Sequence, residues 1–99
     1  MEINRERDRE RLVLRLSGRL DTNTAPGLIK VVEEETEGVK DLRFDLEKLE
    51  YISSAGLRVL LAAYKQMQAV DGEMTVSNAG EDVREVFKIT GFDRTLGMK

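Results

Sequence analysis

Apolar residues recur at two different spacings along this chain, and the change from one spacing to the other constrains the fold more than any other feature. In "RLVLRLS", from Arg11 to Ser17, leucine occupies every second position, which is the period of a β-strand with one buried face. From Ser54 to Val70, apolar side chains recur every three or four positions, which is the period of an amphipathic helix. Strands that alternate with helices predict parallel pairing through right-handed crossovers.

The same two periods assign most of the chain to an element. Strands are expected at 2–7, 11–17, 42–46 and 73–79, and helices at 25–37, 54–70 and 81–90. The first two strands are joined by a short turn, so they are expected to form an antiparallel hairpin. We therefore predict an α/β fold: a small mixed sheet, with an antiparallel N-terminal hairpin followed by parallel strand–helix–strand units, and amphipathic helices packed on it. At 99 residues the chain has the size of a single domain, 1–99.

The ends of these elements are predicted from their capping residues. Thr24 is the expected N-cap of the first helix, with Pro26 in its first turn, and Gly38 is the expected stop. The expected buried face of that helix consists of Ala25, Leu28, Ile29 and Val32. The segment "EKLEYIS", residues 47–53, is expected to be a loop, and for residues 92–99 a short last strand, a short helix and a frayed end stay open.

Histidine and cysteine are both absent from the sequence. Their absence removes Ser-His-Asp catalysis, His-ligated zinc, disulfides and thiolate chemistry, and it disfavours an enzyme without excluding one that uses carboxylates or lysines. We expect no catalytic residue, no metal site and no cofactor.

Charge and hydropathy give further expectations about partners and location. The net charge is -3, and the six arginines of residues 1–20 are interleaved with four acids and no aromatic residue. This pattern is typical of a solvated edge strand rather than of a nucleic-acid interface. No apolar run approaches the roughly 20 residues of a membrane span, and the N-terminus lacks the apolar region of a signal peptide. A cytoplasmic location is the simplest interpretation.

Two junctions between a strand and a helix are candidates for function. "GRLDTNT", residues 18–24, follows the second strand, and "EYISSAG", residues 50–56, follows the third. If those strands are parallel, both junctions emerge at the same end of the sheet, which brings Asp21 near Ser53 and Ser54. For Asp21 two interpretations stay open: it caps its own turn, or it holds the serine loop or touches a metal during phosphoryl transfer.

The two serines have a structural interpretation that is compatible with a functional one. Ser53 or Ser54 is expected to be the N-cap of the following helix, a role worth about 1 kcal/mol. A helix N-terminus also tolerates a phosphate, which would add roughly -2 of charge without unfolding the domain. Ala55 and Gly56 are small enough for a partner to approach closely, although Gly56 could equally serve helix–sheet packing. "SSAG" lacks the first glycine of a nucleophile elbow, and "GRLDTNT" lacks the Gly-Lys-Ser/Thr end of a phosphate-binding loop.

Three stretches together resemble one known family. These are "VLRLSGRLDTNTA", "LRFDLEKLEYISSAGLRVLLAAYKQMQAVDGEMTVSN" and "VREVFKITGFD", which resemble the STAS domain of bacterial anti-sigma-factor antagonists over nearly the whole chain. The resemblance implies a binding protein, not an enzyme, that sequesters an anti-sigma factor and so frees a sigma factor. It implies that the anti-sigma factor is also a serine kinase, that phosphorylation ends the binding, and that a serine phosphatase reverses it.

The resemblance also implies which residues act. The phosphorylated serine of the family matches Ser54, and Ser53, which stands where the family commonly has Asp, is a less favoured second acceptor. Asp21 matches an acidic residue of the family's partner surface. The expected partner-binding residues are Asp21, Thr22, Ser53, Ala55, Gly56, Leu57 and Arg58. The protein is expected to be a monomer or weak dimer that binds no nucleic acid directly.

Two other functions stay open. One is a non-switching STAS module of a lipid-transport or stress-signalling complex, in which Ser54 is only a cap. The other is a small hydrolase that uses Ser54, which the lack of histidine disfavours.

Overall fold

The computed structural model describes residues 1–96, which form a mixed four-stranded sheet and four helices. The elements are β1 (Glu2–Asp8), β2 (Arg11–Leu20), α1 (Ala25–Glu35), β3 (Asp41–Ile52), α2 (Ser54–Ala69), β4 (Glu73–Ser77), α3 (Glu81–Thr90) and α4 (Phe92–Thr95). The strands lie in the order β1-β2-β3-β4, with β1 antiparallel to β2 and every later pair parallel. The predicted fold class is therefore confirmed.

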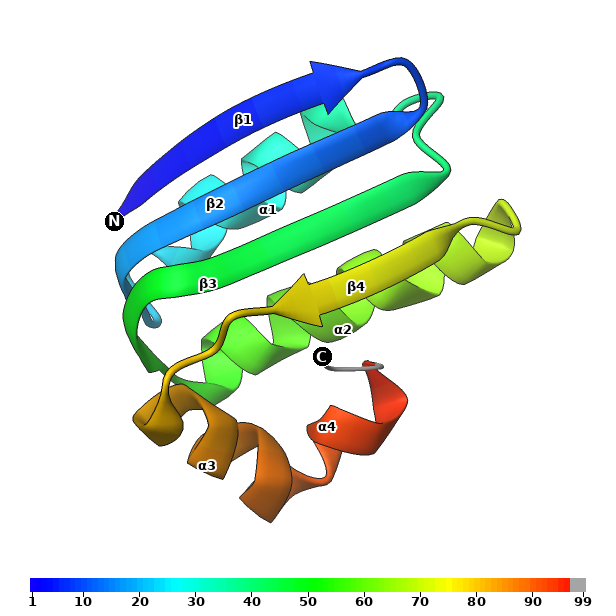
Figure 1. Cartoon of the computed structure of the whole chain (residues 1–99). Helices are drawn as coiled ribbons and strands as arrows, with labels where there is room; N and C mark the ends of the chain where they lie inside the picture. Colours follow the sequence, from blue (N-terminus) through cyan, green and yellow to red (C-terminus); the bar gives the residue numbers. More distant parts are fainter. Residues whose placement is uncertain (97–99) are drawn as a thin grey trace.

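The helices are distributed unevenly around the sheet. Figure 1 shows α1 and α2 against one face of the sheet, with α3 and α4 below its β4 edge. The alternation along β2 places Leu12, Leu14 and Leu16 under the helices, each at most 1% exposed, whereas Arg11 and Arg15 point to solvent. Burying a leucine of this kind stabilises the fold by about 1.5–3 kcal/mol. One face of the sheet thus builds the core, and the other is open and polar.

The predicted loop at residues 47–53 is wrong, because β3 continues through it to Ile52. Its parallel register with β2 runs on to the pair Leu20 and Ile52, but it shifts twice on the way, between Arg15 and Ser17 and between Gly18 and Arg19. Each shift is a β-bulge, in which an extra residue of one strand interrupts the alternation of the side chains. The period of two, by which a strand is predicted, is therefore lost over this half of β3.

The first helix differs from its prediction at its end and on one face. It ends at Glu35, and buried Thr36 is its C-cap, so Gly38 lies in the following turn. Ile29 is 42% exposed, and Val31 is buried in its place. The N-cap position of Thr24 is confirmed, but its hydroxyl makes no capping bond and donates instead to the carbonyl oxygen of Arg19 at 2.8 Å.

Of the three forms expected for the last segment, the structure has the short helix, α4, as far as Leu96. It follows Gly91, whose φ of 77° is the left-handed conformation that ends α3. The rest of that predicted segment, residues 97–99, lies outside the described residues. Within residues 1–96, the model contains no helix that is long and apolar enough to cross a membrane.

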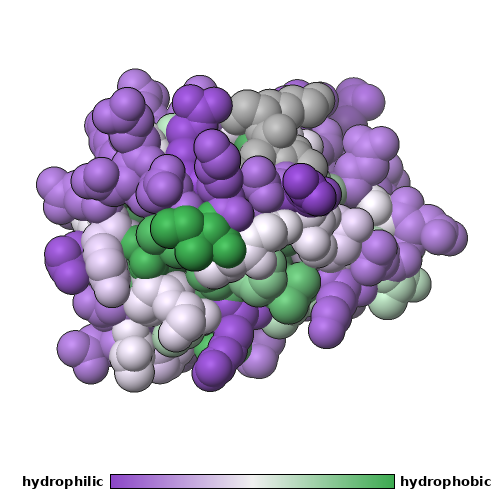
Figure 2. Space-filling view, turned by 90° about the horizontal axis from the view of Figure 1, so that it is seen from below, coloured by the Kyte–Doolittle hydropathy of each residue, from purple (hydrophilic) through white to green (hydrophobic). Residues whose placement is uncertain are grey.

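The lower side of the molecule carries a small apolar area. Figure 2, which views the molecule from below, shows an apolar area with polar side chains above it and side chains of intermediate hydropathy below it. Ile89 of α3 is 75% exposed, more than any other large apolar residue among residues 1–96. Single exposed apolar side chains are common on protein surfaces, so this area by itself indicates no partner.

Candidate functional site

The two junctions predicted to meet do lie together at one end of the sheet. The main-chain N–H of Ser53 donates to the carbonyl oxygen of Leu20 at 2.9 Å, and Leu20 pairs with Ile52 across the parallel strands. This end, where β2 leads to α1 and β3 leads to α2, is on the left in Figure 1. The carboxyl ends of neighbouring parallel strands therefore bring Asp21 and the serine pair to one surface.

The two serines have separate structural roles. Ser53 is the N-cap of α2, with extended backbone at φ -97° and ψ 175°, and its Oγ accepts from the N–H of Gly56 at 3.4 Å. Ser54 is the first residue of the helix and is exposed. The capping role predicted for either serine thus falls to Ser53, and it leaves the hydroxyl of Ser54 accessible beside the positive end of the helix dipole.

Small residues allow the start of α2 to pack closely against the sheet. A Cβ at Gly56 would lie 2.6 Å from Cγ of Leu20 and 2.9 Å from Cγ1 of Ile52, so only glycine fits there without rearrangement. Gly56 and Leu57 are buried, and Ala55 is half-buried. Gly56 therefore serves helix–sheet packing, and it and Leu57 lie beneath the surface rather than on it.

Asp21 caps its own turn. Its Oδ1 accepts from the N–H groups of Asn23 at 3.0 Å and Thr24 at 3.1 Å, and its own N–H donates to the Thr24 hydroxyl at 2.9 Å. The hydrogen bond from the Thr24 N–H is the largest influence on the pKa of Asp21 and lowers it. Desolvation raises the pKa by a smaller amount, whereas the N–H of Asn23, the Thr24 hydroxyl and the charge of Arg19 lower it further. The carboxylate is therefore ionised at neutral pH.

Other predicted residues are placed as follows. Thr22 is exposed beside Asp21, and Arg58 is exposed one turn along α2 from Ser54. Within residues 1–96, no three His, Cys, Asp or Glu side chains are grouped so as to hold a metal ion. The contact that joins the two junctions is the main-chain bond between Ser53 and Leu20, whereas the Asp21 carboxylate holds its own loop.

Two further residues lie at this end of the sheet, and the sequence did not predict them as part of the site. The guanidinium carbon of Arg19 lies 4.2 Å from the centroid of the Tyr51 ring, and Arg19 Nε is 3.9 Å from Oδ2 of Asp21. Tyr51 is 40% exposed. The two residues are partners in the sheet register, but only beyond the second bulge, so no simple count along the strands pairs them. Their pairing depends on the extension of β3 past Leu46 to Ile52.

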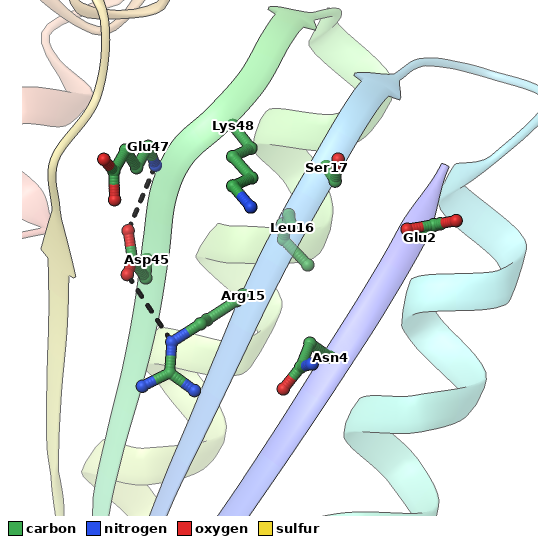
Figure 3. Close-up of a pocket in the computed structure, with 8 residues that line it drawn as sticks. All are labelled: Glu2, Asn4, Arg15, Leu16, Ser17, Asp45, Glu47 and Lys48. Carbon is green, nitrogen blue, oxygen red and sulfur yellow. Dashed lines mark hydrogen bonds and ion pairs between the residues drawn. The ribbon is translucent and has the colours of Figure 1, made fainter.

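Farther along the open face, the first bulge forms a shallow hollow of about 170 Å³. Figure 3 shows Arg15 reaching Asp45, which also accepts from the N–H of Glu47 at 3.1 Å, while Lys48 points toward the hollow. The ion pair between Arg15 and Asp45 measures 3.7 Å. Residues of the serine junction do not contribute to this hollow.

The fold and this site together define a small α/β domain of one family. The STAS domain model matches residues 2–99, and the chain belongs to the STAS domain family.

Named relatives agree with that assignment. The chain is 48% identical over 56 residues to BtrV, a candidate anti-sigma factor antagonist of Bordetella bronchiseptica; the match spans 57% of this chain and about half, 48%, of BtrV. It is 29% identical over 97 residues to the anti-sigma-B factor antagonist of Listeria monocytogenes, which covers 96% of this chain and 84% of the relative.

Solved structures show the same likeness. The unphosphorylated anti-sigma factor antagonist SpoIIAA superposes with a TM-score of 0.84 at 27% identity, over 99% of this chain and 86% of SpoIIAA. Phosphorylated SpoIIAA of Bacillus gives a TM-score of 0.78 at 25% identity, over 99% and 89%. The expected resemblance to this family is confirmed.

Proposed function

We propose that this protein is an anti-sigma factor antagonist that is switched by phosphorylation of Ser54. The observation that carries the proposal is the division of roles between the two serines, because a capping Ser53 leaves the neighbouring Ser54 hydroxyl exposed at the first residue of α2. The names of the relatives and the likeness to SpoIIAA in both phosphorylation states support it.

In the unphosphorylated state, the surface around the two junctions binds an anti-sigma factor that is also a serine kinase. Asp21, Thr22, Ser54 and Arg58 supply its polar groups, with Ser53 and Ala55 half-buried between them and Gly56 and Leu57 supporting them from below. Binding sequesters the anti-sigma factor and frees its sigma factor. This action belongs in the bacterial cytoplasm, where sigma factors work.

Phosphorylation ends the binding by a local change of charge. The Ser54 oxygen attacks the γ-phosphorus of the kinase's ATP, ADP leaves, and the hydroxyl proton passes to a base of the kinase. The phosphate adds roughly -2 of charge at the N-terminus of a helix, where the dipole favours it, so the domain stays folded. Any docked partner then meets a like charge or a changed shape. A serine phosphatase restores the hydroxyl by hydrolysis.

Ser54 is the phosphate acceptor rather than Ser53, because Ser53 is half-buried and its hydroxyl already accepts a hydrogen bond from the N–H of Gly56. The test is to incubate the protein with its cognate anti-sigma kinase and ATP and to map the phosphate by mass spectrometry. We expect phosphate on wild type and on Ser53→Ala, and none on Ser54→Ala. Binding of the anti-sigma factor without phosphate on either serine would instead favour a non-switching STAS module.

A further inference from the structure

We propose that Arg19 and Tyr51, on the open face of the sheet, form an additional contact for the anti-sigma factor and bind a carboxylate of that partner. This inference rests on the proposed function, because it extends the surface around Ser54 to a pair of residues that the sequence did not indicate. It begins from the geometry of the stack, in which the guanidinium carbon lies 4.2 Å from the ring centroid.

The stack holds Arg19 in a defined orientation and leaves it open to solvent. Tyr51 supports one face of the guanidinium, and Asp21 lies at its edge at 3.9 Å. The side chain of Arg19 nevertheless keeps 60% of its exposure. An arginine that is already fixed loses less conformational entropy when it binds a partner than a freely moving one does.

Arg19 differs from the other arginines of the open face in the hydrogen bonds that its guanidinium donates. Arg11 and Arg43 donate hydrogen bonds to Asp41, and Arg15 donates to Glu6. Within residues 1–96, by contrast, the Arg19 guanidinium donates no hydrogen bond, and its ion pair with Asp21 is the longest on this face. Its N–H groups are therefore available to an acceptor on a partner.

This chemistry selects the partner group. A planar guanidinium binds a carboxylate through two parallel hydrogen bonds, and the exposed part of the Tyr51 ring accepts an apolar side chain beside it. Arginine and tyrosine are also the residue types that contribute most to binding at interface centres. We therefore assign to Arg19 and Tyr51 an acidic residue of the anti-sigma factor with an apolar neighbour.

The position of Arg19 also explains how a phosphate on Ser54 would act on the bound partner. Arg19 directly precedes Leu20, and Tyr51 lies two residues before Ser53, whose N–H donates to Leu20, so both side chains lie at the Ser54 end of the sheet. A carboxylate docked on Arg19 carries the same sign of charge as a phosphate on Ser54. Repulsion between these two groups adds to the loss of affinity when Ser54 is modified.

The test measures the affinity of wild type and of single variants for the cognate anti-sigma factor by isothermal titration calorimetry. We expect Arg19→Ala and Tyr51→Ala each to weaken binding at least about tenfold, with losses that are less than additive in the double variant. Tyr51→Phe, which keeps the ring, should bind like wild type. Arg15→Ala is the matched control, since Arg15 lies on the same strand and face but at the hollow, and it should bind within about twofold of wild type.

The assignment of a carboxylate is tested by charge reversal. Arg19→Glu should abolish binding, and exchanging one acidic residue of the anti-sigma factor for arginine should restore it. Unchanged affinity of Arg19→Ala and Tyr51→Ala, while wild type binds, would overturn this inference and leave the proposed function standing. Failure of wild type to bind its anti-sigma factor would overturn both.

Discussion

Gly56 packs directly against Leu20, so closely that a Cβ on the glycine would lie 2.6 Å from Cγ of the leucine. This contact joins the first turn of α2 to the end of β2 and thereby sets where Ser53 and Ser54 emerge. A residue without a side chain is what lets the serine pair and the Asp21 turn share one surface.

Gly56→Ala should therefore destabilise the protein by about 1–3 kcal/mol, because overpacking outweighs the better helix propensity of alanine. Urea unfolding measures the change. Gly27→Ala is the matched control: it is also a glycine in the first turn of a helix, but nothing lies within 4 Å of its Cβ position. That variant should be stabilised by about 0.5–1 kcal/mol. Equal effects of the two substitutions would contradict the packing role of Gly56.

Replacing each of the two serines by alanine should change the free energy of unfolding by different amounts. Ser53→Ala removes the hydroxyl that accepts from Gly56 and should cost about 0.5–1 kcal/mol, the lower part of the usual range because that bond measures 3.4 Å. Ser54→Ala removes an exposed hydroxyl and should change the free energy of unfolding by less than about 0.5 kcal/mol. A larger loss of stability for Ser54→Ala than for Ser53→Ala would contradict the assignment of the cap to Ser53.

A charge at Ser54 should imitate the phosphorylated state. Ser54→Asp should fold normally, because a helix N-terminus favours an anion, yet it should bind the anti-sigma factor more weakly than wild type. Ser54→Asn has nearly the same size without the charge and serves as the control. Surface plasmon resonance with the immobilised anti-sigma factor measures both, and undiminished binding of Ser54→Asp would count against the charge mechanism.

Arg7 ties the edge strand β1 to the end of α1. Its guanidinium donates to the carbonyl oxygens of Arg9 at 3.0 Å, Glu35 at 3.2 Å and Glu37 at 3.0 Å. Arg7→Ala should cost about 1 kcal/mol, with thermal unfolding as the measurement. Arg5→Ala, which removes an exposed ion pair to Glu35 at 3.1 Å, should cost less than Arg7→Ala, and an equal or larger loss would contradict the tether.

Asp41 should make stability depend on acid pH. Burial raises the pKa of Asp41, but the hydrogen bonds and charges of Arg43 and Arg11 outweigh it, so the pKa lies below its ordinary value. A lowered pKa in the folded state adds stability above the pKa of the unfolded state, near pH 4, and this stability is lost as the pH falls through the folded value. Asp41→Asn should be less stable at pH 7 and should lose less on acidification, as urea unfolding between pH 2 and pH 7 would show; Asp71→Asn, at an exposed position, is the control.

Elements whose side chains keep a regular period could be predicted from the amino-acid sequence. The leucines of β2, the stripe of α2, the hairpin and the parallel pairing all follow from local spacing and from the handedness of crossovers. The meeting of the Asp21 turn with the serine pair followed from topology alone, and the identity of the family followed from motifs. The single domain and the oligomeric state stay predictions.

Other features depend on contacts that the local spacing of residues does not encode. The second half of β3 forms a strand because β2 supplies hydrogen-bonding partners across two bulges, although the bulges remove its period of two. The same bulges bring Arg19 onto Tyr51. Both adjacent serines are suitable caps by residue type, and the packing of Gly56 on Leu20 and Ile52 sets the turn in which Ser53 caps and Ser54 is exposed. These outcomes depend on contacts between distant segments, which no window along the sequence contains.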